Sequence, residues 1–173
     1  MISFGYGVAL DAIGPELMDD LREWRNDPRI RDWCRQLGLI TPRDQERWYL
    51  WQNDDKATHM FAIVEQGNGL VIGVCGLTSI DLIARRAEFS LYIAPNHQGL
   101  GYGYSALRTL CKYGFSELGL NSIWGESFAG NPALTLFKRI GFVLEGTRRQ
   151  FYFKGGKFVD AQLVSMLKNE FIG

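Results

Sequence analysis

The chain has few histidines, few cysteines and no excess of either charge. Its two histidines are His59 and His97, and its three cysteines, Cys34, Cys75 and Cys111, are far apart with no CxxC pair. No group therefore has metal-ligand spacing, so no bound metal is expected and the cysteines are expected to be reduced core residues. Nineteen basic residues balance nineteen acidic ones, which argues against nucleic acid or an anionic membrane surface as a partner.

Long apolar runs are also absent. Hydrophobic residues make up 46% of the 173 residues, but no run approaches the ~18 residues that a membrane-spanning helix needs. The N-terminal segment MISFGYGVALDAIG contains neither a basic leader nor a sustained apolar stretch, so nothing indicates secretion and a cytoplasmic protein is expected. The length suits one domain, residues 1–173, with a sizeable core.

The spacing of apolar residues and turn residues predicts a mixed α/β (α+β) architecture. Strands are expected over residues 4–10, 59–65, 70–81, 87–93, 122–128, 142–153 and 158–168. Helices are expected over residues 15–27, 30–37, 41–51, 104–118 and 132–140. The first helices form an arm over about 15–53 that precedes the main sheet, and residues 57–173 form the rest of the domain.

A glycine-rich turn joins one of these strands to a helix. The segment HQGLGYGYSAL contains Gly99, Gly101 and Gly103, which remove side chains from the turn so that backbone N–H groups can surround an anion. The helix that follows directs its positive end to the same place, so the segment predicts a phosphate site. A GxxxxGK[ST] loop is absent, and the GxGxG spacing after the fourth strand does not fit a dinucleotide fingerprint near the first strand.

Two further segments complete a pattern around this turn. The strand before it places Glu88, Ser90 and Tyr92 on one polar face, and the stretch NPALTLFKRIGF follows some thirty residues later. Together with QGLGYG they resemble the GNAT superfamily of acetyl-CoA-dependent N-acetyltransferases, whose [RQ]xxGx[GA] turn is matched by Gln98, Gly101 and Gly103.

The segments WRNDPRIRDW, ITPRDQERWYLW and RRAEFSLYIAPNHQGLGYG are similar to one branch of this superfamily. That branch includes ribosomal-protein N-terminal, spermidine and pseudaminic-pathway amino-sugar acetyltransferases. The resemblance implies the GNAT fold, a mixed, mostly antiparallel sheet of about seven strands flanked by helices. A V-shaped opening is expected between the fourth and fifth strands.

The resemblance also implies acetyl-CoA as the cosubstrate and no metal. Its pyrophosphate is expected on the N–H groups of the glycine turn, and its pantetheine arm is expected to pair with backbone groups of residues 91–93, as an added strand would. Asn131 is expected to bind this arm, to cap a helix, or both. The residues expected to bind the cosubstrate are Leu91, Tyr92, Ile93, Gln98, Gly99, Leu100, Gly101, Tyr102, Gly103, Tyr104, Asn131 and Phe137.

Acetyl transfer to an amine requires a base, because a primary amine has a pKa near ~10.4. Glu88 is the candidate base, acting directly or through a water, although it could equally be a glutamate paired with Arg85 or Arg86. Glu126, on the facing strand, is the second candidate. The backbone N–H near Tyr92 is expected to stabilise the oxyanion.

Phe137 departs from the family pattern, because many relatives have a tyrosine there as the general acid. A thiolate is tolerable without such an acid, since a thiol has a pKa near ~8.5. Tyr92, Tyr104 and Tyr152 are the candidates for replacing the missing hydroxyl.

The acceptor side is less defined by the sequence. Trp24, Asn26 and Glu126 are expected to contact the acceptor, although Trp24 also fits an apolar helix face, and the alternative is that it is a core residue. Arg148 and Arg149 are either solvated strand charges or ligands of an acidic acceptor.

The resulting hypothesis is acetylation of a primary amine on a small molecule, an amino sugar or a polyamine, with a homodimer left open. The alternatives are acetylation of a protein or peptide N-terminus and a non-catalytic acyl-CoA sensor.

Overall fold

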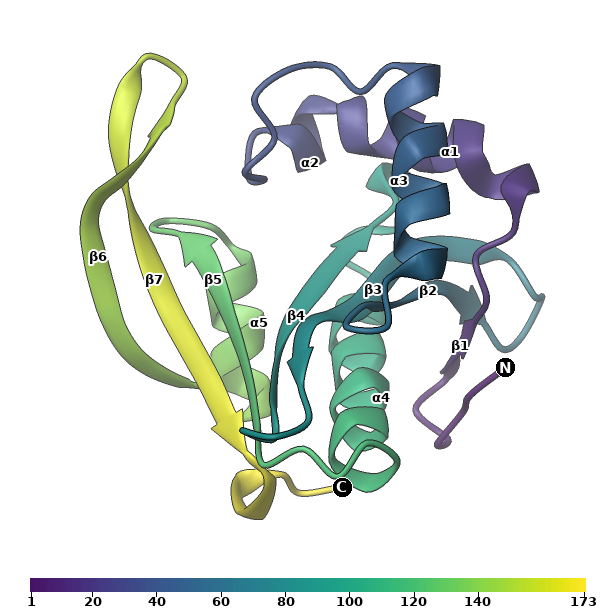
Figure 1. Cartoon of the computed structure of the whole chain (residues 1–173), viewed down its shortest axis with the longest axis vertical. Coiled ribbons are helices and arrows are strands. Elements are labelled where there is room, and N and C mark those ends of the chain that lie inside the picture. Colours follow the sequence, from purple (N-terminus) through teal and green to yellow (C-terminus); the bar gives the residue numbers. More distant parts are fainter.

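The computed structural model describes all residues, 1–173, as one seven-stranded sheet flanked by helices (Figure 1). The strands are β1 (Val8–Asp11), β2 (His59–Glu65), β3 (Val71–Asp81), β4 (Arg86–Ile93), β5 (Ser122–Phe128), β6 (Val143–Lys154) and β7 (Lys157–Leu167). The helices are α1 (Met18–Asn26), α2 (Pro28–Arg31), α3 (Pro42–Asp54), α4 (Tyr102–Ser116) and α5 (Ala133–Ile140), with short 3-10 turns η1 (Pro15–Leu17), η2 (Pro95–His97) and η3 (Lys168–Glu170).

The sheet has the strand order β1-β2-β3-β4-β5-β7-β6, and all neighbours are antiparallel except β4 and β5. That parallel pair is short. It extends from Arg86 opposite Ser122 to Glu88 opposite Trp124, although β4 continues to Ile93. Figure 1 shows the two strands diverging beyond this point. The mostly antiparallel sheet and the V-shaped opening between the fourth and fifth strands are therefore confirmed.

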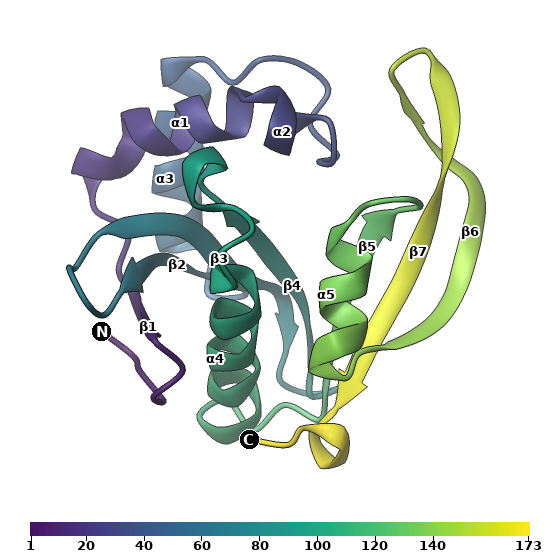
Figure 2. The ribbon, with the colours of Figure 1, turned by 180° about the vertical axis from the view of Figure 1, so that it is seen from behind.

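Helices cover both faces of the sheet. The arm α1 to α3 lies on one face, and α4 and α5 lie on the other, as the view from behind shows (Figure 2). The main core of 19 buried residues forms between α4 and the sheet, where Leu107, Leu110 and Phe115 of α4 pack. This arrangement leaves the V open between the arm and α5.

The arm is held by local signals and by its own small core. Thr41 and Asp44 form a capping box at the start of α3, with Pro42 at its first position. Leu21 of α1 is fully buried in a cluster with Ala62 and Val74 of the sheet. None of the helices in the chain has the length and apolar character needed to cross a membrane.

Several predicted boundaries are wrong; for example, the helix expected over 41–51 continues to Asp54, and the helix expected to end at residue 118 ends at Ser116. The first strand begins at Val8 rather than at residue 4, because the chain bends at residues 5–7. The helix expected over 30–37 ends at Arg31, and residues 32–40 form a loop whose carbonyl groups bond elsewhere. Helix α4 begins at Tyr102 rather than Tyr104, which brings the helix closer to the turn.

Candidate active site

A cavity of about 460 Å³ lies against the glycine turn, between the end of β4 and the first residues of α5. We call it the donor cavity. Every residue expected to bind the cosubstrate lines it except Leu100, whose side chain is 65% exposed. The turn, the end of β4 and the start of α5 are therefore brought together as the sequence predicts.

The glycine turn has a conformation that requires glycine. Gly99 and Gly101 have φ angles of +79° and +86°, in the left-handed region, and a Cβ at either would meet no atom within 4 Å. The requirement is therefore conformational rather than steric. Gly103 differs from the expectation, because it lies inside α4, where a Cβ would approach Leu136 Cδ2 at 3.2 Å.

The residues around the donor cavity fit a phosphate-bearing cosubstrate. The N–H groups of Tyr102 and Gly103 open α4 and have no carbonyl partner one turn earlier, and both residues line the cavity. His97 contributes a buried Nδ1 without a hydrogen-bond partner. Arg139 adds a guanidinium beside the Tyr104 ring, at 5.2 Å from its centroid.

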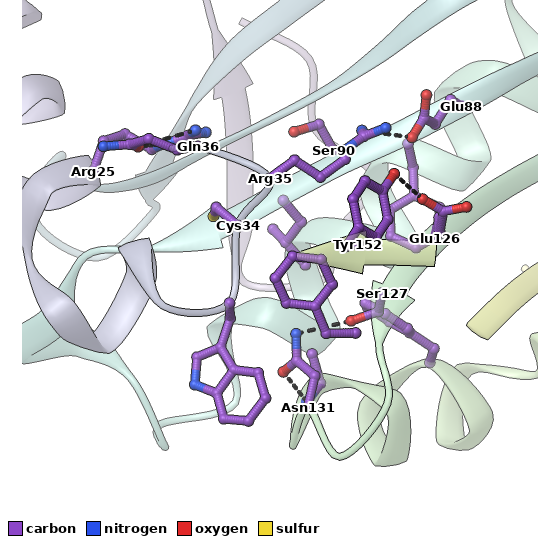
Figure 3. A pocket seen from close by; sticks show the side chains of 16 residues that line it. Arg25, Cys34, Arg35, Gln36, Glu88, Ser90, Glu126, Ser127, Asn131 and Tyr152 are labelled. Atoms are coloured by element: carbon purple, nitrogen blue, oxygen red, sulfur yellow. Dashed lines mark hydrogen bonds and ion pairs between the residues drawn. The ribbon is translucent and has the colours of Figure 1, made fainter. Parts of the chain in front are cut away.

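A second cavity, of about 200 Å³, adjoins the donor cavity within the V (Figure 3). We call it the reaction cavity. It shares with the donor cavity Trp33, Cys34, Leu91, Asn131, Ala133 and Phe137. Its other walls come from β4, β5, β6, the end of α1 and the loop 32–40, so together with α5 six separate segments of the chain enclose it.

Glu88 lies in the reaction cavity and is paired with an arginine. Its residue is only 8% exposed, and its Oε1 accepts a hydrogen bond from Arg35 Nη2 at 2.7 Å. Arg85 and Arg86, the expected partners, bond to Leu118 O and Asp81 instead. Sequence reasoning did not identify Arg35 as the partner of Glu88, because 53 residues separate the two.

The Arg35 guanidinium keeps its charge in this position. Burial would lower the pKa of Arg35, but the charge of Glu88 and hydrogen bonding with Tyr152 and Glu88 together raise that pKa above its ordinary value. Glu88 is therefore held against a fixed positive charge.

Glu126, on the opposite wall, is also engaged. Its Oε2 accepts from Arg148 Nη1 at 2.9 Å, and the Tyr152 hydroxyl donates to its Oε1. Burial and the hydrogen bond with Glu126 raise the pKa of Tyr152, against the opposing effect of Arg35. The Tyr152 hydroxyl consequently stays protonated at neutral pH and lies in the reaction cavity (Figure 3).

The other two tyrosine candidates lie elsewhere. Tyr92 lines the donor cavity rather than the reaction cavity, and burial raises its pKa. The Tyr104 hydroxyl accepts a hydrogen bond from Arg108 at 3.0 Å on the side of α4. Of the three, Tyr152 alone lines the reaction cavity.

Asn131 precedes Pro132, the N-cap residue of α5, and both polar groups of its side chain are engaged. Its Oδ1 accepts from Ala133 N–H at 3.0 Å near the start of α5, and its Nδ2 donates to Ser127 Oγ at 2.8 Å across the cavity wall (Figure 3). Phe137 is 6% exposed and packs edge-on against Phe89, with ring centroids 4.9 Å apart. Gly125 makes this packing possible, because a Cβ there would lie 2.3 Å from the Phe89 ring.

Trp24 and Asn26, expected to contact the acceptor, line neither cavity. Trp24 packs against the small core of the arm. Asn26 holds the loop instead, since its Nδ2 donates to Ile40 O at 2.9 Å and its Oδ1 accepts from Ile40 N–H at 2.8 Å. Arg25, between them in the sequence, does line the reaction cavity.

The loop 32–40 is also held from across the V. Lys154, near the tip of the β6–β7 hairpin, donates through Nζ to the carbonyl oxygens of Arg31, Cys34 and Gln36, at 2.9, 2.9 and 2.6 Å. Figure 1 shows this hairpin rising opposite α2. The two sides of the V are thus joined above the reaction cavity.

Comparison with known proteins agrees with this geometry. Residues 8–143 match the family model of the acetyltransferase (GNAT) domain. The chain is 34% identical over 160 residues to the uncharacterized N-acetyltransferase p20 of Bacillus licheniformis, covering 90% of this chain and 89% of that protein. It is 33% identical over 119 residues to the spermidine N(1)-acetyltransferase of Vibrio cholerae, covering 68% of each.

The fold gives a closer match. The crystal structure of the Vibrio cholerae spermidine N-acetyltransferase in complex with CoA and spermine superposes with a TM-score of 0.90 at 26% identity, covering 96% of this chain and 99% of that chain. A dodecameric structure of the same enzyme superposes with a TM-score of 0.82 at 25% identity, covering 96% and 97%. This chain therefore belongs to the GNAT family and is an acetyl-CoA-dependent N-acetyltransferase.

Proposed function

We propose that this enzyme acetylates the primary amine of a small molecule, of the amino-sugar or polyamine class. The observation that carries the proposal is the reaction cavity, which is only about 200 Å³ and holds Glu88 beside the donor cavity. A peptide N-terminus would favour an open, acidic groove, whereas both carboxylates here are already paired with arginines. The similarity to spermidine acetyltransferases supports an amine acceptor.

The donor cavity would hold acetyl-CoA through the chain's backbone. The free N–H groups at the start of α4 suit the pyrophosphate, and each anion contact at a helix N-terminus contributes typically ~0.3–1 kcal/mol. Leu91 to Ile93 lie beyond the last β4–β5 pair, so their edge can pair with an extended ligand. Asn131 lines both cavities and would bind the same arm.

Acetyl-CoA supplies the acetyl group as a thioester, so a C–N bond replaces a C–S bond while one proton leaves the amine and one reaches the sulfur. Glu88 would accept the amine proton, directly or through a water. The fixed charge of Arg35 beside it lowers the pKa of a nearby amine, which favours the neutral nucleophile. A backbone N–H of Tyr92 or Ile93 would donate to the developing oxyanion.

We further propose that the enzyme acts in the cytoplasm and assembles at least as a homodimer. All three cysteines are unpaired, and two are buried, as is typical of a reducing compartment. A relative of the same fold forms a dodecamer, which supports self-association.

Release of free thiol from acetyl-CoA tests the proposed function. The purified full chain would be offered spermidine, glucosamine, amino-sugar phosphates and a set of N-terminal peptides, with the mass of each product measured. Acetylation of at least one small amine, with no peptide turned over faster, is the expected result. Turnover confined to peptides would favour the N-terminal alternative, and binding of acetyl-CoA without any turnover would favour a sensor.

A further inference from the structure

Arg25 is the charged side chain of the reaction cavity that lacks a partner of opposite charge. Arg35 pairs with Glu88, and Glu126 pairs with Arg148, so every carboxylate lining this cavity is neutralised. The Arg25 guanidinium donates only to the neutral Gln36 Oε1, through Nε and Nη2 at 3.4 Å each, which is the long limit of a hydrogen bond. Figure 3 shows the two side chains together at one end of the cavity.

Arg25 also stands at the entrance to a third cavity, of about 210 Å³, between α3 and the sheet. We call it the side chamber. Arg25 and Ser90 line both the side chamber and the reaction cavity. Its remaining walls combine apolar and aromatic side chains with polar ones. The apolar and aromatic residues are Ile40, Trp48, Trp51, Met60 and Tyr92, and the polar residues are Asp44, Gln45, Thr58 and Thr78.

We propose that the acceptor carries an anionic group, a carboxylate or a phosphate, close to its amine, and that Arg25 binds that group. This rests on the proposed function and narrows its substrate class. The amine lies toward Glu88, the anion lies on the Arg25 guanidinium, and the apolar or ring portion extends into the side chamber. A guanidinium fits a carboxylate or phosphate with paired N–H donors, which gives both affinity and orientation.

The same charges disfavour a polyamine. A polycation would place its second ammonium near Arg25 or Arg35, and no unpaired carboxylate lines the reaction cavity to receive it. Asp44, the carboxylate of the side chamber, already accepts a hydrogen bond from the Thr41 hydroxyl and lies 3.9 Å from Arg47. Like charges at short range in a partly buried site repel strongly. Within the proposed class of small amines, acidic acceptors such as amino-sugar phosphates or amino acids are therefore favoured over spermidine.

Matched pairs of amines that differ only in the anion test this inference. Thiol release from acetyl-CoA would be measured with glucosamine 6-phosphate against glucosamine, with tyrosine against tyramine, and with spermidine. We expect kcat/KM for the favoured acidic member to exceed that of its neutral partner at least ~10-fold, from a charge-assisted hydrogen bond. The phosphate and carboxylate pairs distinguish the two kinds of anion.

Variants then assign the preference to Arg25. Arg25→Gln should lower kcat/KM for the acidic amine about 10- to 100-fold and lower it much less for the neutral amine. The melting temperature of the variant checks its folding. Arg25→Lys should restore part of the loss because it keeps the charge. Arg43→Gln makes the same change of charge on exposed α3, at a residue outside all three cavities, and should leave the preference intact.

Calorimetric titration of the same amines into the enzyme with CoA separates the two proposals. One outcome is that no amine is acetylated, yet an acidic amine binds the native chain and does not bind Arg25→Gln. This outcome would support the anion site and refute the proposed acetyl transfer. If neutral amines or spermidine are acetylated in preference, the proposed function stands and the anion site is refuted. Equal binding of acidic and neutral members, or a preference that survives Arg25→Gln, also refutes it.

Discussion

Replacing Lys154 by methionine should release the loop that closes the reaction cavity. In the native chain the Lys154 ammonium donates to the carbonyl oxygens of Arg31, Cys34 and Gln36. Methionine has a similar length and no donor, so the change removes these hydrogen bonds while retaining the apolar stem. The hairpin and the loop 32–40 would then lose their direct polar connection.

The magnitude follows from the hydrogen bonds and the exposure of the loop. A hydrogen bond to a charged group contributes about 1.5–3 kcal/mol when its partner stays buried. Most of the loop is exposed, so water can replace the ammonium at the released carbonyls. We therefore expect the closed loop to be destabilised by about 2 kcal/mol, which is less than the sum of the three hydrogen bonds. This change shifts the equilibrium between the closed and open loop by about 30-fold.

Amide hydrogen exchange measures this shift without knowledge of the acceptor. Exchange of the loop 32–40 should accelerate by about 30-fold in Lys154→Met, while amides of α4 stay protected. Lys157→Met is the matched control, since Lys157 lies on the same hairpin with an exposed side chain. Equal exchange of the loop in the native chain and in Lys154→Met would refute the reasoning.

Further predictions concern the base, the turn and the stability. Glu88→Gln should lower kcat about 10²- to 10⁴-fold and leave the KM for acetyl-CoA nearly unchanged; a kcat within threefold of native would exclude Glu88 as the base. Gly101→Ala places a Cβ at φ +86°, which costs about 1–2 kcal/mol of strain, and should weaken the binding of acetyl-CoA in a titration. Gly146→Ala is the control, because that site has open space and no positive φ, and it should leave the binding unchanged. Burial lowers the pKa of His59, so its contribution to stability is complete above pH ~6.5 and is lost as the pH falls. Thermal unfolding between pH 8 and 5 should therefore show a steeper loss for the native chain than for His59→Gln, and parallel curves would contradict this.

The glycine turn and the polar strand could be predicted because their signals are local. The turn conformation at Gly99 and Gly101 depends on adjacent residues, and the side of β4 that carries Glu88 follows from the two-residue period of a strand. These local signals are enough to predict the turn beside the donor cavity and the strand face that carries Glu88. They contain no information about which distant side chains meet Glu88.

The acceptor half depends on contacts between distant segments. Arg35 reaches Glu88 across 53 residues, and Lys154 reaches the Arg31 carbonyl across 123. The loop 32–40 has a helical pattern in the sequence, but Lys154 and Asn26 bond its backbone in another conformation. Local propensity is too weak to predict this outcome, because tertiary hydrogen bonds of this kind outweigh it.

The sequence by itself determined the strand-to-helix turn with its left-handed glycines and the polar face of the preceding strand that carries Glu88. The tertiary structure alone decided what surrounds that carboxylate. Arg35 lies beside it, the group of Glu126, Arg148 and Tyr152 lies opposite, and Arg25, which has no carboxylate partner, lines both the reaction cavity and the side chamber. The physical reason is the range of the forces involved. Backbone conformation and strand period are set by neighbouring residues, whereas charge pairing in a cavity is set by how separate segments of the chain pack.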